Sequence, residues 1–489
     1  MPFPDDPSLT ALYPPDLKLK FVEIIHRHGE RSTATNFFPK AQPEGTWRLC
    51  HTKPLLHAFH AATSDLLSKN GDAGFEGRDE DNPGTPLSES LPPQFKNVVL
   101  EPAHHTIDRL STAKALKTQL TADGTCFTGQ LTDKGKQTMQ TSGENLRKHY
   151  IERLGLFSGR LDGDYHRDVY LRSTDYPRTI ESLQYLLHGL HPTSSRVGES
   201  AEDLTIHVRS AKGETLYPSH SCSALNLASK AFRKTLGAQL SAQTAPLIQK
   251  LGFLGTDPAK PHLFQIHALE DTFTCMRAHD IPLPAGVTDE MMREMHEMTT
   301  RQWIGIYEDE KRAGMGIGWC LGDLRGKILE AVEGGEGAVK MAVFSAHDTT
   351  VGPILTALKA WDGKYPTFGA MINIELFEEL TPLPQRTSPF RSAWNWLKNS
   401  SSPAPSPSPF TSPSTNPSTP PAHYIRLLYN GLPLTLPACA PANAHRGTDT
   451  TMCTLDAFLK EVDRLVPKKE WEEVCRVEGG EKVAFDWRY

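Results

Sequence analysis

A short basic stretch near the start of the sequence has residue types suited to phosphate chemistry. It reads Arg27-His28-Gly29-Glu30-Arg31. Arginine is always charged, and its planar guanidinium binds phosphate oxygens through paired hydrogen bonds. A histidine between two arginines could attack phosphorus, because imidazole is a competent nucleophile. The stretch predicts a phosphate site with His28 as the nucleophile and Arg27 and Arg31 as ligands.

Two later stretches carry the groups that the first one lacks. Arg172 begins one of them, and His347 and Asp348 are adjacent in the other. Phosphoryl transfer needs cations on the equatorial oxygens, an in-line nucleophile and an acid for the leaving oxygen. Arg172 and His347 extend the cationic set, and Asp348 is the candidate acid. Because an acid catalyst needs a raised pKa, we expect the apolar neighbours Ala346 and Val351 to raise that of Asp348.

Each stretch follows a segment that is typical of a buried strand. These segments are residues 21–25, 168–171 and 339–344, which are rich in β-branched, aromatic and other apolar residues. The carboxyl ends of parallel strands meet at one edge of an open α/β sheet, where ligands bind. We therefore expect the six candidate residues to converge at this edge.

The rest of the chain alternates between strand and helix patterns, which predicts an α/β protein with a mostly parallel central sheet. The expected parts are a core of residues 18–32, 166–212 and 313–466, cap insertions of residues 33–165 and 213–312 that are mainly helical, and a C-terminal tail of residues 467–489. Residues 399–421, nearly all Ser, Pro, Thr and Ala, are expected to form a disordered loop between two strands.

Composition excludes several classes of function. The 489-residue chain has a formal net charge of −6 at pH 7, so we expect no nucleic-acid partner. No apolar run reaches the ~20 residues needed to span a bilayer. The N-terminal residues lack the pattern of a signal peptide, which predicts an intracellular, cytoplasmic protein.

The cysteines and histidines show no spacing typical of a metal site, so we expect neither a metal nor another cofactor. Eight cysteines are present without a C-x-x-C motif. Their redox state and the oligomeric state of the chain are left open by the sequence.

The three stretches, which contain Arg27 to Arg31, Arg172, and His347 with Asp348, resemble the signatures of the histidine acid phosphatases. This family is the second branch of the histidine phosphatase superfamily. The similarity runs in order through roughly residues 20 to 466. It implies a three-layer α/β/α core and metal-independent hydrolysis of small-molecule phosphomonoesters, typically at acid pH. It also implies a phosphohistidine on His28, a proton donor at Asp348, and phosphate binding by Arg27, Arg31, Arg172 and His347.

The resemblance leaves several alternatives open. Residues 178–190 are most similar to the lysophosphatidic acid phosphatases, so lysophosphatidate or another small phosphomonoester is the expected substrate. A phytase, a phosphoglycerate-mutase-like enzyme and a non-catalytic phosphate-binding scaffold are the alternatives. Ser32 replaces a proline that is usual in the family, and Cys439 and Cys453 resemble a paired set in secreted relatives. We expect Arg178 to have a structural role, paired with Asp175 or a neighbouring strand.

Overall fold

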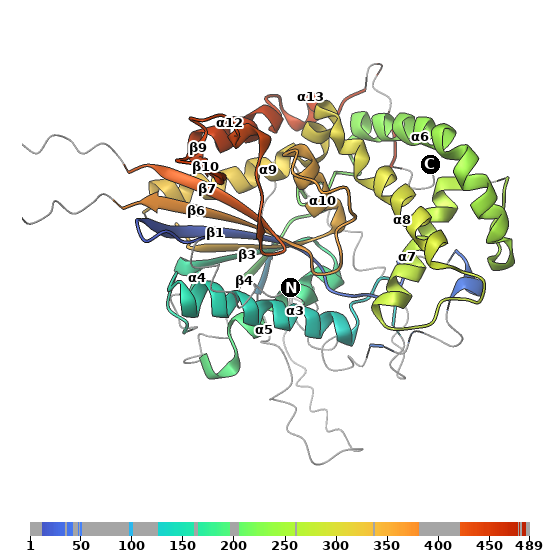
Figure 1. Cartoon of the computed structure of the whole chain (residues 1–489), viewed down its shortest axis with the longest axis horizontal. Coiled ribbons are helices and arrows are strands. Elements are labelled where there is room, and N and C mark those ends of the chain that lie inside the picture. The colour runs from blue at the N-terminus through green and yellow to red at the C-terminus, as the bar shows by residue number, and fades with distance from the viewer. Residues whose placement is uncertain are drawn as a thin grey trace, which may run out of the picture.

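In the computed structural model, the central feature is one long mixed sheet (Figure 1). The structure describes residues 12–34, 37–42, 47, 49–50, 97–100, 126–160, 165–195, 205–259, 262–335, 338–380, 421–477, 479 and 482–485. The parallel part has the order β2 (Asn97–Leu100), β4 (Thr205–Val208), β3 (Val169–Ser173), β5 (Met341–Ala346) and β1 (Leu17–Arg27). Antiparallel pairing then adds β6 (Met371–Glu379), β7 (His423–Tyr429), β10 (Asp449–Thr454) and β9 (His445–Arg446), while β8 (Leu432–Pro433) pairs with β7. The predicted α/β fold is confirmed.

The register of the parallel strands brings the three predicted stretches together. Arg27, the last residue of β1, lies beside Ala346 at the end of β5. Ser173, the last residue of β3, lies beside Ser345 of β5. The residues that follow these strands therefore leave the sheet at one edge.

Helices cover both faces of the sheet. Along β1, Val22 and Ile24 face a layer that contains α3 (Asp133–Leu146) and α5 (Pro177–Leu190). Phe21 and Ile25 point to the other face, because successive side chains on a strand alternate. That face packs against α9 (Glu310–Glu333), α10 (Asp348–Ala357) and α12 (Leu455–Leu465). These layers form a three-layer α/β/α core.

A separate group of helices adjoins the carboxyl edge of the sheet. It consists of α6 (Ser223–Lys250), α7 (His262–Ala278) and α8 (Asp289–Trp303), which lie together at the right of Figure 1. Buried residues of these helices, such as Leu240, Phe273 and Met295, form their own hydrophobic cluster. Shorter elements are α4 (Tyr165–Asp168), a π-helical segment (Arg147–Arg153) and α13 (Trp471–Val474).

The first expected insertion, residues 33–165, does not belong wholly to the cap. Helix α3 packs against α5 on the core sheet, and β2 extends that sheet beyond β4. A side chain at Gly143 would collide with the carbonyl oxygen of Leu186 in α5, so glycine permits this close helix contact. The expected boundary fails here because the periodicity of α3 shows a helix but does not show which surface that helix covers.

Disulfide bonds pair six of the cysteines. They join Cys50 to Cys126, Cys222 to Cys475, and Cys439 to Cys453, and the last is the pair that the resemblance implied. Cys275 and Cys320 are buried free thiols.

Two expectations concern segments with simple composition. Within the described ranges, no helix is both long and apolar enough to cross a membrane. The Ser/Pro-rich segment 399–421 lies outside the described residues, apart from Pro421 at its end.

Candidate active site

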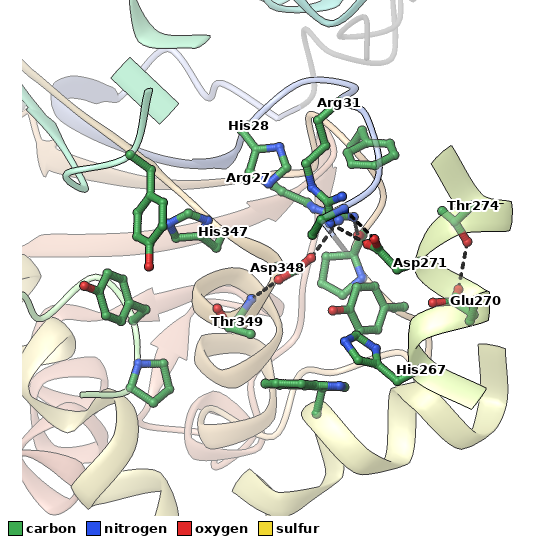
Figure 2. Close-up of a pocket in the computed structure, with 18 of the residues that line it drawn as sticks. Arg27, His28, Arg31, His267, Glu270, Asp271, Thr274, His347, Asp348 and Thr349 are labelled. Atoms are coloured by element: carbon green, nitrogen blue, oxygen red, sulfur yellow. Dashed lines mark hydrogen bonds and ion pairs between the residues drawn. The ribbon is translucent and has the colours of Figure 1, made fainter. Parts of the chain in front are cut away.

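A cavity of about 500 Å³ lies at the carboxyl edge of the sheet, between the core and helices α6, α7 and α8. Five of the six predicted residues line it: Arg27, His28, Arg31, His347 and Asp348. Figure 2 shows these five side chains together with other residues that line the cavity.

The imidazole of His28 is held in one tautomer. Its Nδ1 lies 2.8 Å from the carbonyl oxygen of Gly29, and a carbonyl can only accept, so Nδ1 carries the proton. The lone pair is then on Nε2. Burial, followed by the charges of Arg178 and Arg27, lowers the pKa of His28 well below its ordinary value. The ring is therefore neutral in mildly acidic solution.

Close packing beside His28 requires a glycine at position 29. A Cβ at this position would collide with the backbone carbonyl oxygen of Gly135 in the first turn of α3. The amide of Gly29 donates to Ser182 Oγ of α5 over 3.1 Å. These contacts fix the turn that follows β1 and, with it, the orientation of His28.

Arg27 lies between Asp348 and an aromatic ring. Its Nη2 is 2.6 Å from Asp348 Oδ2, and its Nη1 donates to the carbonyl oxygen of Pro366 over 2.6 Å. The guanidinium carbon lies 4.2 Å from the centroid of the Phe368 ring. Since this side chain is 4% exposed, its position is fixed before any ligand arrives.

Arg31 is oriented by a residue that the sequence did not reveal. Asp271 of α7 accepts from Arg31 Nη2 over 2.7 Å and from the amide of Ala34 over 2.7 Å. Although burial opposes it, the charge of Arg31 lowers the pKa of Asp271 to about 2. Asp271 is thus ionised at acid pH and holds the guanidinium beside His28 (Figure 2).

The structure does not bring Arg172 to the cavity. Its guanidinium forms buried ion pairs with Glu214 over 2.6 Å and with Asp323 of α9 over 2.7 Å. Arg172 lies within β3, where alternation directs it toward the α9 face instead of the sheet edge. The expected phosphate-binding position of Arg172 is therefore corrected to a structural position in the core.

Arg178 takes the place in the cavity that was expected for Arg172. It lies in the first turn of α5, lines the cavity, and contacts the ring of Tyr176 at 4.6 Å. Among the described residues Arg178 forms no salt bridge, so the expected pairing with Asp175 is wrong. Burial and the charge of Arg31 lower its pKa to about 10. A buried cation without a salt bridge to a carboxylate is suited to binding an anion.

Exchanging the two arginines for alanine separates these positions experimentally. Arg178→Ala should weaken competitive inhibition by inorganic phosphate by ~10-fold or more, because a charge-assisted hydrogen bond is lost. Arg172→Ala should instead lower the free energy of unfolding by about 3–5 kcal/mol, because Glu214 is left buried without its partner. Inhibition constants and denaturant titrations measure the two effects. Equal inhibition constants for Arg178→Ala and the unmodified chain would contradict the assignment.

His347 and Asp348 stand at the start of α10. His347 precedes the helix, and its Nε2 lies 3.0 Å from Thr174 Oγ1. Asp348 accepts from the amide of Thr349 over 2.7 Å. A helix N-terminus favours negative charge, so this end of α10 supports an anion in the cavity.

The expectation of a raised pKa for Asp348 is wrong for the unliganded site. Burial does raise it, but the charges of Arg27 and Arg31 outweigh burial and lower the pKa of Asp348 below its ordinary value. Asp348 is therefore ionised and paired with Arg27 at rest. The effect of the apolar neighbours is smaller than that of the two arginines that converge on the same carboxyl.

Ser32 compensates for the absent proline through hydrogen bonds. Its amide donates to the carbonyl oxygen of Gln130 over 2.9 Å, and its hydroxyl donates to that of Phe127 over 2.5 Å. Proline could form neither bond. The turn after Arg31 is thus fixed by contact with residues 127–130.

The remaining cavity wall is made largely of helices α6–α8 and of loops that the sequence did not single out. It includes Tyr217, His220, Arg233, His267, Glu270, Trp303, Tyr365, Phe368 and Phe485. His296 of α8 lies 3.0 Å from Glu270 of α7, and this hydrogen bond raises the pKa of His296. This part of the wall thus combines aromatic rings with a few ionisable side chains.

A neutral histidine, a cluster of arginines and an adjacent carboxyl lie together at one edge of the sheet, an arrangement typical of enzymes of phosphoryl transfer. The chain belongs to the histidine phosphatase superfamily (branch 2), whose family model matches residues 18–430. It is accordingly a phosphatase of the histidine acid phosphatase type.

Relatives with established or assigned names agree with this membership. A probable acid phosphatase of Schizosaccharomyces pombe is 27% identical over 95% of both chains. The human lysophosphatidic acid phosphatase type 6 is 27% identical over 74% of this chain and 75% of its own. Bovine lysosomal acid phosphatase is 26% identical over 72% of this chain and 73% of its own.

Solved structures support the fold. The phytase of Hafnia alvei in complex with myo-inositol hexakis sulphate matches with a TM-score of 0.54 at 13% identity, covering 95% of this chain and 100% of the phytase. The phytase of Klebsiella sp. ASR1 matches with a TM-score of 0.51 at 15% identity, covering 94% of this chain and 98% of the phytase. At such identities the likeness concerns the architecture alone.

Proposed function

We propose that this phosphatase hydrolyses phosphomonoesters through a covalent phosphohistidine on His28, with Asp348 as the proton donor. One observation carries the proposal: a neutral imidazole with its free Nε2 lies in a cavity among Arg27, Arg31 and Arg178. The arginines would hold the phosphoryl oxygens, and His347 would add a further hydrogen bond.

In the first step, His28 Nε2 attacks phosphorus and the bond between phosphorus and the ester oxygen breaks. Asp348 gives its proton to the departing oxygen, which leaves as an alcohol. In the second step, the Asp348 carboxylate takes a proton from water, and the resulting hydroxide attacks phosphorus. The bond between phosphorus and Nε2 then breaks, which releases inorganic phosphate and restores both residues.

Substrate binding would supply the proton that Asp348 needs. In the unliganded site Asp348 is ionised because Arg27 and Arg31 lower its pKa. A bound phosphate dianion would engage the same arginines and place negative charge beside the carboxyl, and both effects raise a carboxyl pKa. Asp348 would thus take up a proton as the substrate binds and would become an acid only in the complex.

Rapid quenching with a ³²P-labelled aryl phosphate tests the covalent step. Labelled protein should be stable to alkali and labile to acid, as a phosphoramidate is, and the label should map to the peptide that contains His28. Incorporation at any other residue, or none under conditions of steady turnover, would refute the covalent proposal.

The lowered pKa of His28 sets the acid side of the pH profile. Protonation of Nε2 blocks attack, so activity is lost as the pH falls through the pKa of His28. Because that pKa lies well below its ordinary value of 6.5, kcat/KM should hold at pH 6.5 and decline only at pH values well below it. A profile of kcat/KM from pH 3 to 8 measures this limb. An acid limb centred at or above pH 6.5 would show that His28 is not the titrating nucleophile.

The cavity favours an ester with one phosphate and an apolar organic group. Among the described residues that line it there is no lysine, and Arg233 is the arginine outside the phosphate cluster. A polyphosphate would need several further cations for its additional charges. Lysophosphatidate, the substrate in the name of the human relative, belongs to the favoured class, whereas inositol polyphosphates do not.

Comparing substrates tests this preference. Lysophosphatidate and aryl phosphates should give higher kcat/KM than inositol hexakisphosphate, sugar phosphates and phosphopeptides. A preference for inositol hexakisphosphate would favour the phytase alternative. Isomerisation of phosphoglycerate without net hydrolysis would favour a mutase, and phosphate binding without turnover would favour a scaffold.

We further propose that the chain works in an oxidising compartment, contrary to the cytoplasmic expectation. The three disulfide bonds support this, because such bonds persist mainly where thiols are not kept reduced. Mass spectrometry of alkylated protein from its native source would detect the bridges. Six reactive thiols at these positions would favour the cytoplasm instead.

A further inference from the structure

One side chain in the cavity wall comes from the far end of the sequence. Phe485 lines the same cavity as His28, together with residues of α6 and α8. Its ring stacks on that of His220, with 4.1 Å between centroids and 8° between planes. Arg233 of α6 lies 5.4 Å from the Phe485 ring centroid. Phe485 is thus partly buried, and its ring forms part of the cavity wall.

Several bonds hold this end of the chain against the start of α6. The disulfide joins Cys475 to Cys222, which immediately precedes α6, and the amide of Ala224 donates to the carbonyl oxygen of Cys475 over 3.1 Å. Val483 donates through its amide to Ser223 Oγ over 3.1 Å, and its carbonyl accepts from Asn226 Nδ2 over 2.8 Å. The attachment therefore extends from the bridge to within two residues of Phe485.

A series of rings connects Phe485 to the reaction centre. Tyr217 lies 5.8 Å from the His347 ring and 5.7 Å from that of His220, which in turn stacks on Phe485. Trp303 of α8 lies 6.5 Å from Phe485. We call Tyr217, His220, Phe485 and Trp303 the aromatic wall. It begins beside the phosphate-binding residues and continues into the part of the cavity that would receive the organic group.

We propose that residues 482–485, held to α6 by the Cys222–Cys475 disulfide, complete the aromatic wall, and that Phe485 selects esters whose organic group is flat or apolar. The inference rests on the proposed hydrolysis, because it concerns the organic group of that reaction. Phe485 belongs to the binding surface and not to the reacting set. Such a group gains apolar contact and ring stacking at this wall, whereas a small polar group gains neither.

Phe485→Ala provides the test, measured with 1-naphthyl phosphate and with glycerol 2-phosphate. For the naphthyl ester, KM should rise about 10-fold while kcat changes less than about two-fold. The Phe485 ring would contact the naphthyl group equally in the ground state and in the transition state, so its loss weakens binding without slowing the bound substrate. For the glycerol ester, and for inhibition by inorganic phosphate, the change should stay under about two-fold. Phe485→Tyr should keep the KM of the unmodified chain.

Phe253→Ala is the matched control, because Phe253 is 47% exposed in the short 3-10 helix (Gly252–Leu254) after α6 and does not line the cavity. It should leave both substrates unchanged. An equal loss for both esters in Phe485→Ala, or an unchanged KM for the naphthyl ester, would overturn the inference. If phosphohistidine cannot be trapped but the naphthyl-selective change is seen, the covalent mechanism fails and the aromatic wall stands.

The disulfide has its own test. Replacing both Cys222 and Cys475 with serine should reproduce the naphthyl-selective rise in KM, because residues 482–485 lose their anchor. The paired variant of Cys50 and Cys126 is the control, since that bridge joins residues that do not line the cavity. An unmodified KM in the Cys222 and Cys475 double variant would show that the bridge does not hold the wall. Should that variant fail to fold, Phe485→Ala still decides the role of the ring.

Discussion

Replacing His28 with alanine should reduce kcat for 4-nitrophenyl phosphate at pH 5 by at least ~10⁴-fold, because the covalent route disappears with its nucleophile. The cavity should still bind phosphate, since Arg27, Arg31 and Arg178 are unchanged. Inhibition by inorganic phosphate should therefore shift by less than about 10-fold. The combination of lost turnover and kept binding distinguishes a nucleophile from a ligand of the phosphoryl group.

His445→Ala is a suitable control for this variant. His445 lies in β9, where its Nδ1 bonds to the carbonyl oxygen of Cys439 over 2.8 Å, and it does not line the cavity. Its activity should equal that of the unmodified chain. Retention of more than a few per cent of activity in correctly folded His28→Ala would exclude the phosphohistidine mechanism.

Asp348→Asn should give an effect that depends on the leaving group. Alkyl phosphates leave as strongly basic alkoxides, so loss of the acid should slow their reaction by ~10²–10⁴-fold. 4-Nitrophenolate leaves without a proton, so phosphorylation of His28 should proceed while the second step, which needs a base, is slowed. Stopped-flow measurement should then show a burst of nitrophenolate followed by slow turnover.

Asp280→Asn, a change at an exposed residue outside the cavity, should show neither effect. The decisive comparison is the ratio of rates for alkyl and aryl esters. If Asp348→Asn slows both classes equally and gives no burst, Asp348 acts through the position of Arg27 and not through proton transfer.

The sequence allowed the converging edge of the sheet to be predicted, because three apolar strand segments each ended in charged residues. It did not distinguish Arg172 from Arg178. The two differ by position on their elements: Arg172 is the fourth residue of β3, whereas Arg178 is the second of α5. Strand alternation places Arg172 with Tyr170 on a face that a helix covers. The first turn of α5 follows the end of β3 and therefore lies at the sheet edge.

Other features depend on contacts between distant parts of the chain. Asp271 orients Arg31 from α7, and Phe485 reaches the cavity through a disulfide to Cys222. Neither has a local pattern, because a lone aspartate or phenylalanine on an amphipathic segment is common. The prediction of a raised pKa for Asp348 was wrong for the same reason, since the direction of the shift is set by arginines that are remote in sequence.

The antiparallel half of the sheet places the junction between β6 and β7 far from the candidate active site. Strand β6 runs opposite to β1, so Glu379 at its end pairs with Leu17 at the start of β1. The amide of Glu379 donates to the carbonyl oxygen of Ala422, just before β7 begins. The 11 residues of β1 then separate this junction from His28 by roughly 35 Å, at ~3.3 Å per residue.

Deleting residues 399–421 should therefore leave kcat/KM unchanged, as enzyme assays on the shortened chain would show. A large fall in turnover would mean that the segment reaches the site by another path. We therefore expect the connection between β6 and β7 to tolerate inserted sequence. A reporter domain, an affinity tag or a site for kinases could be placed there and read out without disturbing hydrolysis at the opposite end of the sheet.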